Sequence, residues 1–478
     1  MEQSPVFISI SNVIGGEVQP IGVSTTELVN PATETVVGVA TLSREGEVDA
    51  AMSSADAAFR TWRRTTPRER QERLLHFADL IEQNIDRIVE IEVLLTGKPR
   101  VATRVAEVER SIDNIRFFAG ALRVVPGIAQ GEYAAGLTSS IRREPIGVIA
   151  QITPWNFPFM MAVWKIAPAI AAGNTVVLKP ADSTPASSML LAELAQQAFP
   201  AGVVNLVCGD RETGRLLVEH ARPDMVSLTG STRAGSEVMK SAAGTIKRVH
   251  LELGGKAPAV VFADADLEYA AEQIAAGAFW NGGQSCTAET RVLVEESVHE
   301  QFLELLVKAT TALRPGGPDD TDAFYGPLIN EAQLDRILGA LGALPQGARI
   351  VTGGSRVEPG YFLEPTIVDG VAQTDDLVQH ELFGPVLTVQ GFTGEEQAVA
   401  FANDVAFGLA ASVWTRDQGR SARLSIELDA GTVWVNCTQN IPSEMPHGGF
   451  KSSGTGKDLS AYSLEDYTRI KHVLTSHR

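Results

Sequence analysis

The pattern of apolar and polar positions first predicts helices. Between residues 45 and 95, apolar residues recur at helical spacing with charged residues between them. Gly97-Lys98-Pro99 follows as a stop signal, because glycine and proline end helices. The apolar positions that fall on one helical face are Leu74, Phe77, Ala78, Ile81, Ile85 and Ile88.

From about residue 146 the pattern changes to short apolar runs that alternate with helical stretches. Strands followed by helices predict a parallel sheet covered on both faces, and such sheets bind ligands at the carboxyl ends of their strands. The predicted strands are 147–152, 175–178, 203–207, 226–229 and 249–253. The predicted helices are 159–172, 187–197, 213–219 and 234–243.

A second α/β series begins near residue 290. Its predicted strands are 290–294, 385–391, 411–415 and 432–436, with helical stretches such as 299–313 between them. Residues 123–145 and the tail from about 453 are β-prone, and the tail alternates over 467–473. The chain therefore belongs to the α/β class, with a small β element besides its two helix-covered sheets.

Composition narrows the function classes. A chain of 478 residues is long enough for two to four domains at roughly 100–200 residues each. The net charge of −18 argues against nucleic acid and anionic membrane as partners. The N-terminus lacks a basic segment followed by an apolar one, and no apolar run reaches the roughly 20 residues of a membrane span. The nearest run, 157–172, contains Lys165 and Pro168.

The three cysteines have an odd count, long spacings and no CxxC motif or histidine cluster. A disulfide framework and a zinc site are therefore not expected, and we expect no metal and a reducing, cytoplasmic location. Cys208 ends an apolar strand and Cys437 follows an apolar run, as packing residues do. Cys286 instead follows Asn281-Gly282-Gly283-Gln284-Ser285, a polar and small stretch typical of an active-site loop.

Two further residues fit covalent catalysis by Cys286. A free thiol has a pKa of about 8.5, so the nucleophile needs a lowered pKa or a neighbouring base. Glu252 lies on the glycine-rich turn Glu252-Leu253-Gly254-Gly255-Lys256, where a carboxylate can activate water for release of an acyl group, or can simply be exposed. Asn156 is a turn residue between two prolines or an oxyanion donor, which is worth about 3–4 kcal/mol of barrier.

These motifs resemble the NAD(P)-dependent aldehyde dehydrogenase superfamily. The resemblance runs from Asn30-Pro31-Ala32-Thr33 to the segment 446–454, Pro-His-Gly-Gly-Phe-Lys-Ser-Ser-Gly. It implies a small-molecule aldehyde as substrate and a homodimer or homotetramer. It also implies a Rossmann-type cofactor domain over 1–122 and 146–252, an α/β catalytic domain over 253–452, and a small β oligomerisation arm over 123–145 and 453–478.

The resemblance implies a catalytic role for each motif. Cys286 is the nucleophile, Glu252 activates the water that hydrolyses the thioester, and Asn156 with the Cys286 N–H holds the oxyanion. Lys165 follows nine residues after Asn156, and Asp458 matches a position where the family often has glutamate. These two residues form either a proton relay from Glu252 to bulk water or a structural ion pair.

The cofactor positions also follow from the resemblance. Lys179 and Asp182 bind the adenosine ribose, and a carboxylate there should repel a 2′-phosphate, so NAD is preferred over NADP. The turn Gly230-Ser231 has GxxxxG spacing and matches the family's GSTxxG turn, where a helix N-terminus suits a pyrophosphate. Glu381 and Phe383 match residues that grip the nicotinamide ribose and ring, or form a strand-entry turn. The other implied positions are Ile152, Thr153, Pro154, Trp155, Gly209, Gly214, Leu253 and Gly254.

The substrate signal comes from segments that look like bacterial γ-aminobutyraldehyde dehydrogenases, which are close to betaine-aldehyde dehydrogenases. Asp113 is placed to face a substrate ammonium and Trp280 to add a cation–π wall, or both are packing residues. The loop 438–442 is poor in aromatics for a quaternary ammonium cage. An aminoaldehyde such as 4-aminobutanal is therefore expected first, and a general aliphatic, aromatic or betaine aldehyde is the alternative.

Three other functions remain as rivals. Acyl transfer to coenzyme A is disfavoured by Glu252, because that base serves hydrolysis. A structural nucleotide-binding protein derived from a dehydrogenase is disfavoured by the intact set Cys286, Glu252 and Asn156. A cysteine hydrolase needs a partner histidine, and none of the eight histidines lies in a motif near Cys286.

Overall fold

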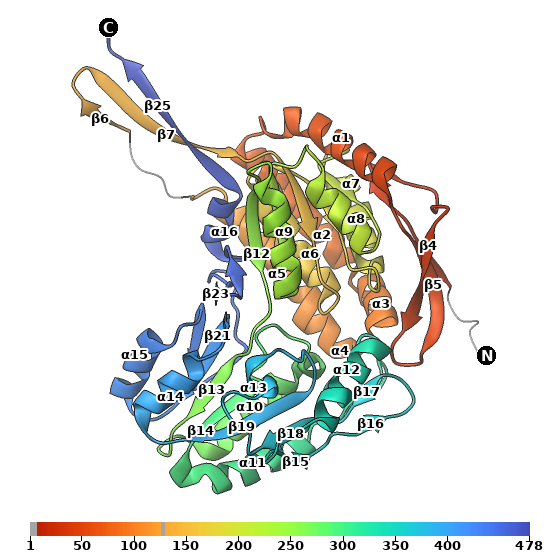
Figure 1. The fold of residues 1–478 in the computed structure, drawn as a ribbon. Helices are drawn as coiled ribbons and strands as arrows, with labels where there is room; N and C mark the ends of the chain where they lie inside the picture. Colours follow the sequence, from red (N-terminus) through yellow and green to blue (C-terminus); the bar gives the residue numbers. More distant parts are fainter. Residues whose placement is uncertain (1–6, 126–129) are drawn as a thin grey trace.

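Two large sheets carry the fold (Figure 1). The computed structural model describes residues 7–125 and 130–478. One sheet has eight strands in the order β24-β12-β11-β8-β9-β10-β2-β3, and the other has seven in the order β15-β18-β19-β14-β13-β21-β22. In the described residues, no helix is both long and apolar enough to cross a bilayer.

The eight-stranded sheet confirms the predicted alternation of strands and helices. Its central strands are parallel and mostly buried, as apolar runs covered by helices on both faces require. The strands are β8 (Val148–Ile152), β9 (Thr175–Lys179), β10 (Val204–Leu206), β11 (Met225–Thr229) and β12 (Arg248–Glu252). The helices are α6 (Pro158–Ala171), α7 (Ala186–Ala198), α8 (Arg211–Glu219) and α9 (Thr232–Ala243).

The edges of this sheet were not predicted. β2 (Val13–Ile14), β3 (Glu17–Val18) and β24 (Gly454–Thr455) join it in antiparallel pairs. Two-residue strands are too short to show an alternating pattern. A separate three-stranded sheet near the N-terminus contains β1 (Ile8–Ile10), β5 (Thr35–Thr41) and β4 (Thr25–Asn30).

The helices predicted over 45–95 are α1 (Glu45–Trp62), α2 (Pro67–Gln83) and α3 (Ile85–Thr96). Thr66 and Glu69 form a reciprocal capping box with Pro67 at the first position, which begins α2. The single apolar face is wrong beyond Asn84, because α2 ends there and Ile85 begins α3. The predicted stop is confirmed, since Gly97 has φ 67° and caps α3.

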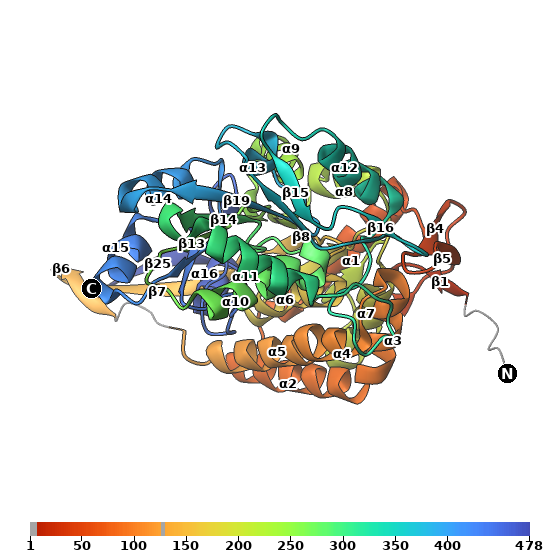
Figure 2. The same cartoon turned by 90° about the horizontal axis from the view of Figure 1, so that it is seen from below.

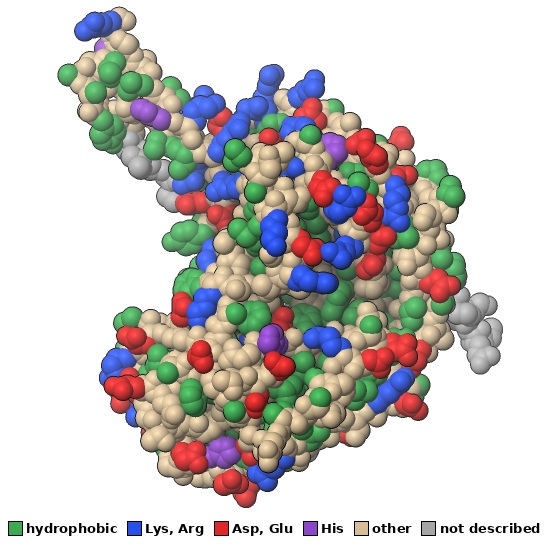
Figure 3. All heavy atoms as spheres, viewed as in Figure 1, with side chains coloured by type: hydrophobic (Ala, Val, Ile, Leu, Met, Phe, Trp, Pro, Cys, Tyr) green, Lys and Arg blue, Asp and Glu red, His purple; other side chains and the backbone are tan. Residues whose placement is uncertain are grey.

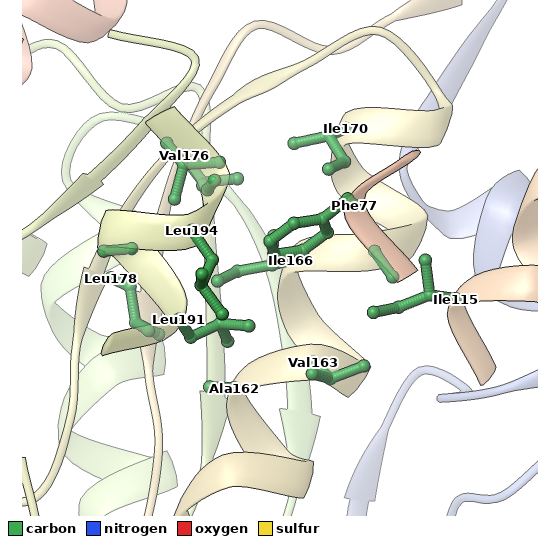
Figure 4. Close-up of a cluster of buried hydrophobic side chains, with 14 of the residues drawn as sticks. Phe77, Ile115, Ala162, Val163, Ile166, Ile170, Val176, Leu178, Leu191 and Leu194 are labelled. Atoms are coloured by element: carbon green, nitrogen blue, oxygen red, sulfur yellow. The ribbon is translucent and has the colours of Figure 1, made fainter. Parts of the chain in front are cut away.

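Two short helices, α4 (Arg100–Thr103) and the π-helical turn η1 (Arg104–Glu109), lead into α5 (Arg110–Ala121). Figure 2 shows α5 side by side with α2. The core between these helices and the first sheet is drawn in Figure 4, where Phe77, Ile115, Ile166 and Leu191 converge from α2, α5, α6 and α7. Each such buried side chain contributes about 1.5–3 kcal/mol.

The seven-stranded sheet contains all four strands predicted for the second series. Three more strands, β13, β15 and β18, were not predicted. The strands are β13 (Pro258–Val261), β14 (Arg291–Glu295), β15 (Arg349–Thr352), β18 (Thr366–Asp369), β19 (Val386–Phe392), β21 (Ala410–Trp414) and β22 (Thr432–Val435). The helices around it include α10 (Leu267–Phe279), α11 (His299–Thr311), α12 (Glu331–Gly342), α14 (Gly394–Asn403) and α15 (Gln418–Glu427).

A small sheet projects from the body (Figure 1). It consists of β6 (Gly131–Ala134), β7 (Leu137–Pro145) and β25 (Thr468–Ser476), so the end of the tail pairs with the first β-prone segment as expected. The start of the tail is a correction, because β24 pairs with β12 in the eight-stranded sheet and Ser460–Asp466 forms the helix α16. Its surface exposes Tyr133, Ile470 and Leu474, and Figure 3 shows hydrophobic side chains along it. Residues 126–129 of the predicted arm lie outside the described residues. The bridging of subunits and the domain boundaries stay predictions.

Candidate active site

A cavity of about 1200 Å³ lies at the carboxyl ends of β8, β11 and β12 and extends to the loop that carries Cys286. The expectation that a ligand binds at the carboxyl ends of the parallel strands therefore predicts the position of this cavity correctly. The predicted residues in its lining are Ile152, Thr153, Pro154, Trp155, Asn156, Gly230, Ser231, Glu252, Leu253, Gly254, Trp280, Cys286, Glu381, Phe383 and Asp458. The predicted residues outside this lining are Asp113, Lys165, Lys179, Asp182, Gly209 and Gly214.

A tight turn delivers Cys286 to the cavity wall. After α10 ends, Asn281, Gly282 and Gly283 have φ values of 53°, 63° and 68°, in the left-handed region that glycine and asparagine tolerate. The turn then packs on the Glu252 motif. A Cβ on Gly255 would lie 2.3 Å from the Cys286 carbonyl oxygen, so the two motifs meet only because that position has no side chain.

The surroundings of Cys286 keep its thiol protonated. Burial raises the pKa of the Cys286 thiol to about 12, and the nearby carboxyl groups of Glu381 and Glu252 act in the same direction. The sequence left open a lowered pKa or a neighbouring base. Because the pKa is raised, a neighbouring base is needed to take the thiol proton.

Glu252 is a base without a structural partner. It ends β12 with 3% of its surface exposed, and neither carboxyl oxygen has a hydrogen-bond partner among the described residues. Burial raises its pKa well above the ordinary range, and the charge of Asp458 adds to this. An unpaired buried carboxyl is costly. A base whose pKa is tuned upward suits proton transfer near neutral pH.

Asn156 presents an amide to the Cys286 loop. Its Nδ2 donates to the Gln284 carbonyl at 3.0 Å, two residues before Cys286. Its own backbone carbonyl accepts from the Lys98 ammonium and from Asn281 Nδ2, the latter at 3.0 Å. The amide donor is therefore held beside the nucleophile loop, as an oxyanion donor must be.

Lys165 and Asp458 form a buried ion pair. Lys165 Nζ donates to Asp458 Oδ2 at 2.9 Å, and His250 Nε2 lies 3.1 Å from the other carboxylate oxygen. Burial opposes the charge on Asp458, but Lys165 and His250 together hold its pKa below the ordinary value. Asp458 is thus an anion at neutral pH, which fits the ion-pair interpretation. The relay role of these residues stays a prediction.

One end of the cavity fits a dinucleotide. Gly230 and Ser231 lie at the N-terminus of α9, which attracts phosphate. Glu381 accepts from the Gly255 N–H at 3.0 Å, and a Cβ on Gly254 would lie 2.2 Å from its second oxygen. The rings of Phe383 and Trp155 meet edge to face with centroids 5.3 Å apart. These groups can hold a phosphate, a ribose hydroxyl and a flat ring.

The predicted adenosine site lies at the margin of this cavity. Ala181 lines it, between Pro180 and the exposed Asp182. Lys179 is buried, and its ammonium donates to the carbonyls of Pro180 and Gly209, both at 2.7 Å. Gly214 packs beside the Lys179 stem. The roles of Lys179, Asp182, Gly209 and Gly214 stay predictions.

The substrate side has residues that the sequence analysis missed. An apolar wall lies beside Trp280. Four of its residues share one face of the stretch after Asn156, and their helical spacing was a usable signal. Arg110 lies at the rim and donates to the Ile441 carbonyl at 3.4 Å, and no local motif marks it. The wall residues are Phe157, Met160, Met161, Trp164 and Ile441.

Asp113 is exposed and lies outside the cavity lining. Its carboxylate accepts a hydrogen bond from the Ser443 hydroxyl. Direct contact with a substrate ammonium is therefore not part of this geometry. No group of three metal-ligating side chains occurs within residues 7–125 and 130–478.

Comparisons with known proteins agree with this geometry. The model of the aldehyde dehydrogenase family matches residues 18–473. An aldehyde dehydrogenase of Emericella nidulans is 39% identical, over 98% of both chains. A betaine aldehyde dehydrogenase from Staphylococcus aureus in complex with NAD⁺ is 34% identical, with a TM-score of 0.95 over 98% of this chain and 95% of that one. A P. syringae indole-3-acetaldehyde dehydrogenase mutant in complex with NAD⁺ is 35% identical, with a TM-score of 0.95 over 98% and 96%.

Proposed function

The chain belongs to the aldehyde dehydrogenase family, and from that premise we propose that it oxidises an aldehyde to a carboxylic acid with NAD⁺ through a thioester on Cys286. The observation that carries the proposal is that Cys286 lines the same cavity as Glu252, a buried residue whose carboxyl oxygens have no hydrogen-bond partner among the described residues. Solved relatives hold NAD⁺, which supports the same cofactor here. Glu252 also favours hydrolysis over transfer to coenzyme A.

The residues perform the reaction in two stages. The Cys286 sulfur attacks the aldehyde carbon while its proton passes to a base, and the Asn156 amide and the Cys286 N–H donate to the oxygen that becomes negative. Bound NAD⁺ supplies the hydride acceptor that turns the adduct into a thioester. Glu252 then takes a proton from water, the resulting hydroxide attacks the thioester carbonyl, and the acid leaves as Cys286 regains its proton.

Different residues at the cofactor end of the cavity would bind different parts of NAD⁺. Ser231 and the first N–H groups of α9 would bind the pyrophosphate. Glu381 would accept from ribose hydroxyls, and Phe383 would lie against the nicotinamide. The preference for NAD⁺ over NADP⁺ rests on the exposed carboxylate of Asp182.

Replacing Asp182 with serine should relax this preference. The change removes the like charge that a 2′-phosphate would meet, and the ratio of kcat/KM for NAD⁺ over NADP⁺ should fall about tenfold, or 1.4 kcal/mol. Steady-state kinetics with both cofactors measure it. Asp224→Ser, which changes a carboxylate outside the cavity lining, is the control. Equal use of both cofactors by the wild type would show that Asp182 is misplaced.

The cavity wall supports an apolar aromatic or aliphatic aldehyde as the substrate. Phe157, Met161, Trp164 and Trp280 provide aromatic and apolar surface, and the charge at the rim is the cation Arg110. An aminoaldehyde such as 4-aminobutanal is the second candidate. Trp280 supports it, because an indole face attracts an ammonium group.

A matched panel of phenylacetaldehyde, propanal and 3-aminopropanal tests the two candidates. The apolar wall predicts that kcat/KM for phenylacetaldehyde exceeds that for 3-aminopropanal by about tenfold or more, because burying an ammonium costs free energy. A preference for 3-aminopropanal would favour the second candidate. In that case, a KM increase confined to this substrate in Asp113→Asn would give Asp113 its predicted role. Equal changes for all three aldehydes would make Asp113 structural.

A further inference from the structure

We propose that Lys98 is a positioning residue for the oxyanion donor Asn156. In the sequence, the motif Gly97-Lys98-Pro99 only marked the end of a helix. In the structure, the ammonium of its lysine donates to the Asn156 carbonyl in the active-site turn. The inference rests on the proposed function, since it concerns the geometry of the same reaction.

The Lys98 ammonium is buried and contacts the turn on which Asn156 lies. Only 6% of the residue surface is exposed. Its Nζ donates to the Asn156 backbone carbonyl and to Glu107 Oε1, the latter at 2.7 Å. It also lies over the Phe157 ring, 4.5 Å from the centroid. Removing an ammonium from water costs several kcal/mol, so this placement needs compensation.

The Asn156 carbonyl joins this lysine to the nucleophile loop. Asn281 Nδ2 donates to the same carbonyl at 3.0 Å and to the Gln284 carbonyl at 3.3 Å. The Asn156 side chain donates to that same Gln284 carbonyl at 3.0 Å. Lys98 and Asn281 of the Cys286 loop therefore fix the Asn156 carbonyl together. Without Lys98, the Asn156 carbonyl keeps only one of its two donors, Asn281 Nδ2.

Two buried carboxyl groups complete the cluster. Glu107 lies on the π-helical turn η1, an element that is frequent at functional sites, and its Oε2 has no partner among the described residues. Burial raises the pKa of Glu107 to about 8, and Lys98 opposes that shift. Glu92 accepts from the Phe159 N–H at 3.2 Å. The cluster thus contacts this segment at the Asn156 carbonyl, the Phe157 ring and the Phe159 N–H.

The test begins with Lys98→Met, which keeps the length of the side chain and removes the ammonium. We expect kcat to fall about 10- to 100-fold, because a misplaced catalytic group costs rates of this order. The Kd for NAD⁺ should stay within about twofold. Lys98→Arg should retain most of the activity.

Because Lys98→Met leaves Glu107 without its cation, the paired variant Lys98→Met/Glu107→Gln is measured beside it. Lys247→Met is the matched control, since Lys247 Nζ also donates to two backbone carbonyls, those of Val218 and His220, outside the cavity lining.

A double-mutant cycle with Asn156→Ala separates positioning from general stability. In the Asn156→Ala background, Lys98→Met should cost less than about twofold, because the donor that it positions is already gone. Equal losses in both backgrounds, or wild-type kcat in both Lys98→Met and Lys98→Met/Glu107→Gln, would overturn the proposal. Failure of the wild type to form NADH would instead reject the proposed function. The fall in kcat of Asn156→Ala alone measures the oxyanion role separately.

Discussion

Replacing Cys286 with alanine should abolish NADH formation from every aldehyde, by about 10⁴-fold or more, because no other group forms the covalent adduct. NAD⁺ binding should stay nearly unchanged, since the thiol is not among the groups that would hold the pyrophosphate or the ribose. Absorbance at the NADH band measures the first quantity, and calorimetric titration with NAD⁺ measures the second.

The matched control is Cys437→Ala, which removes a partly exposed thiol that packs beside Trp434 and lies outside the cavity lining. It should keep wild-type turnover. Full dehydrogenase activity in Cys286→Ala would contradict the covalent mechanism. Loss of NAD⁺ binding in the same variant would show that the thiol loop holds the cofactor as well.

Replacing Glu252 with glutamine should separate the two stages of the reaction. We expect a burst of one NADH per active site and a steady state slower than wild type by about 10²–10³-fold, because general base catalysis is lost from thioester hydrolysis. Rapid-mixing kinetics measure both phases. Loss of the burst together with turnover would show that Glu252 takes the Cys286 proton.

The pH dependence gives a second readout of Glu252. Only the ionised carboxylate is a base, and burial raises its pKa well above the ordinary range. Hydrolysis by the wild type should therefore rise with pH through a value higher than an ordinary glutamate would give, and this rise should vanish in Glu252→Gln. Glu289→Gln is the control, because burial also raises the pKa of Glu289, to about 7, outside the cavity lining.

The fold was largely predictable because its central elements carry strong local patterns. The strands β8, β9 and β11 are mostly apolar and buried, and the helices between the strands keep a helical period. Asn84 shows the limit, since a helix can end and restart without breaking the apolar period. The strands β2, β3 and β24 are fixed by pairing with distant neighbours and leave no local pattern.

The candidate site likewise contains residues that a local motif marks and residues that only distant contacts place. Cys286 and Glu252 lie in motifs whose small neighbours are needed where backbones approach closely, as Gly255 is against Cys286. Asn156 lies in a turn motif between two prolines. Arg110 and Lys98 contribute through contacts with residues far along the chain, which no spacing reveals. Asp113 was placed by the resemblance to aminoaldehyde dehydrogenases, and in the structure its carboxylate accepts from the Ser443 hydroxyl.

The covalent thioester is the central claim, and mass spectrometry of the Glu252→Gln variant tests it most directly. The variant is mixed with NAD⁺ and phenylacetaldehyde, quenched in acid after the burst, and digested. The account predicts that the peptide containing Cys286 gains the mass of one phenylacetyl group in place of a hydrogen, in amounts equal to the NADH formed. A full burst with an unmodified Cys286 peptide, or with the acyl group on another residue, would contradict it.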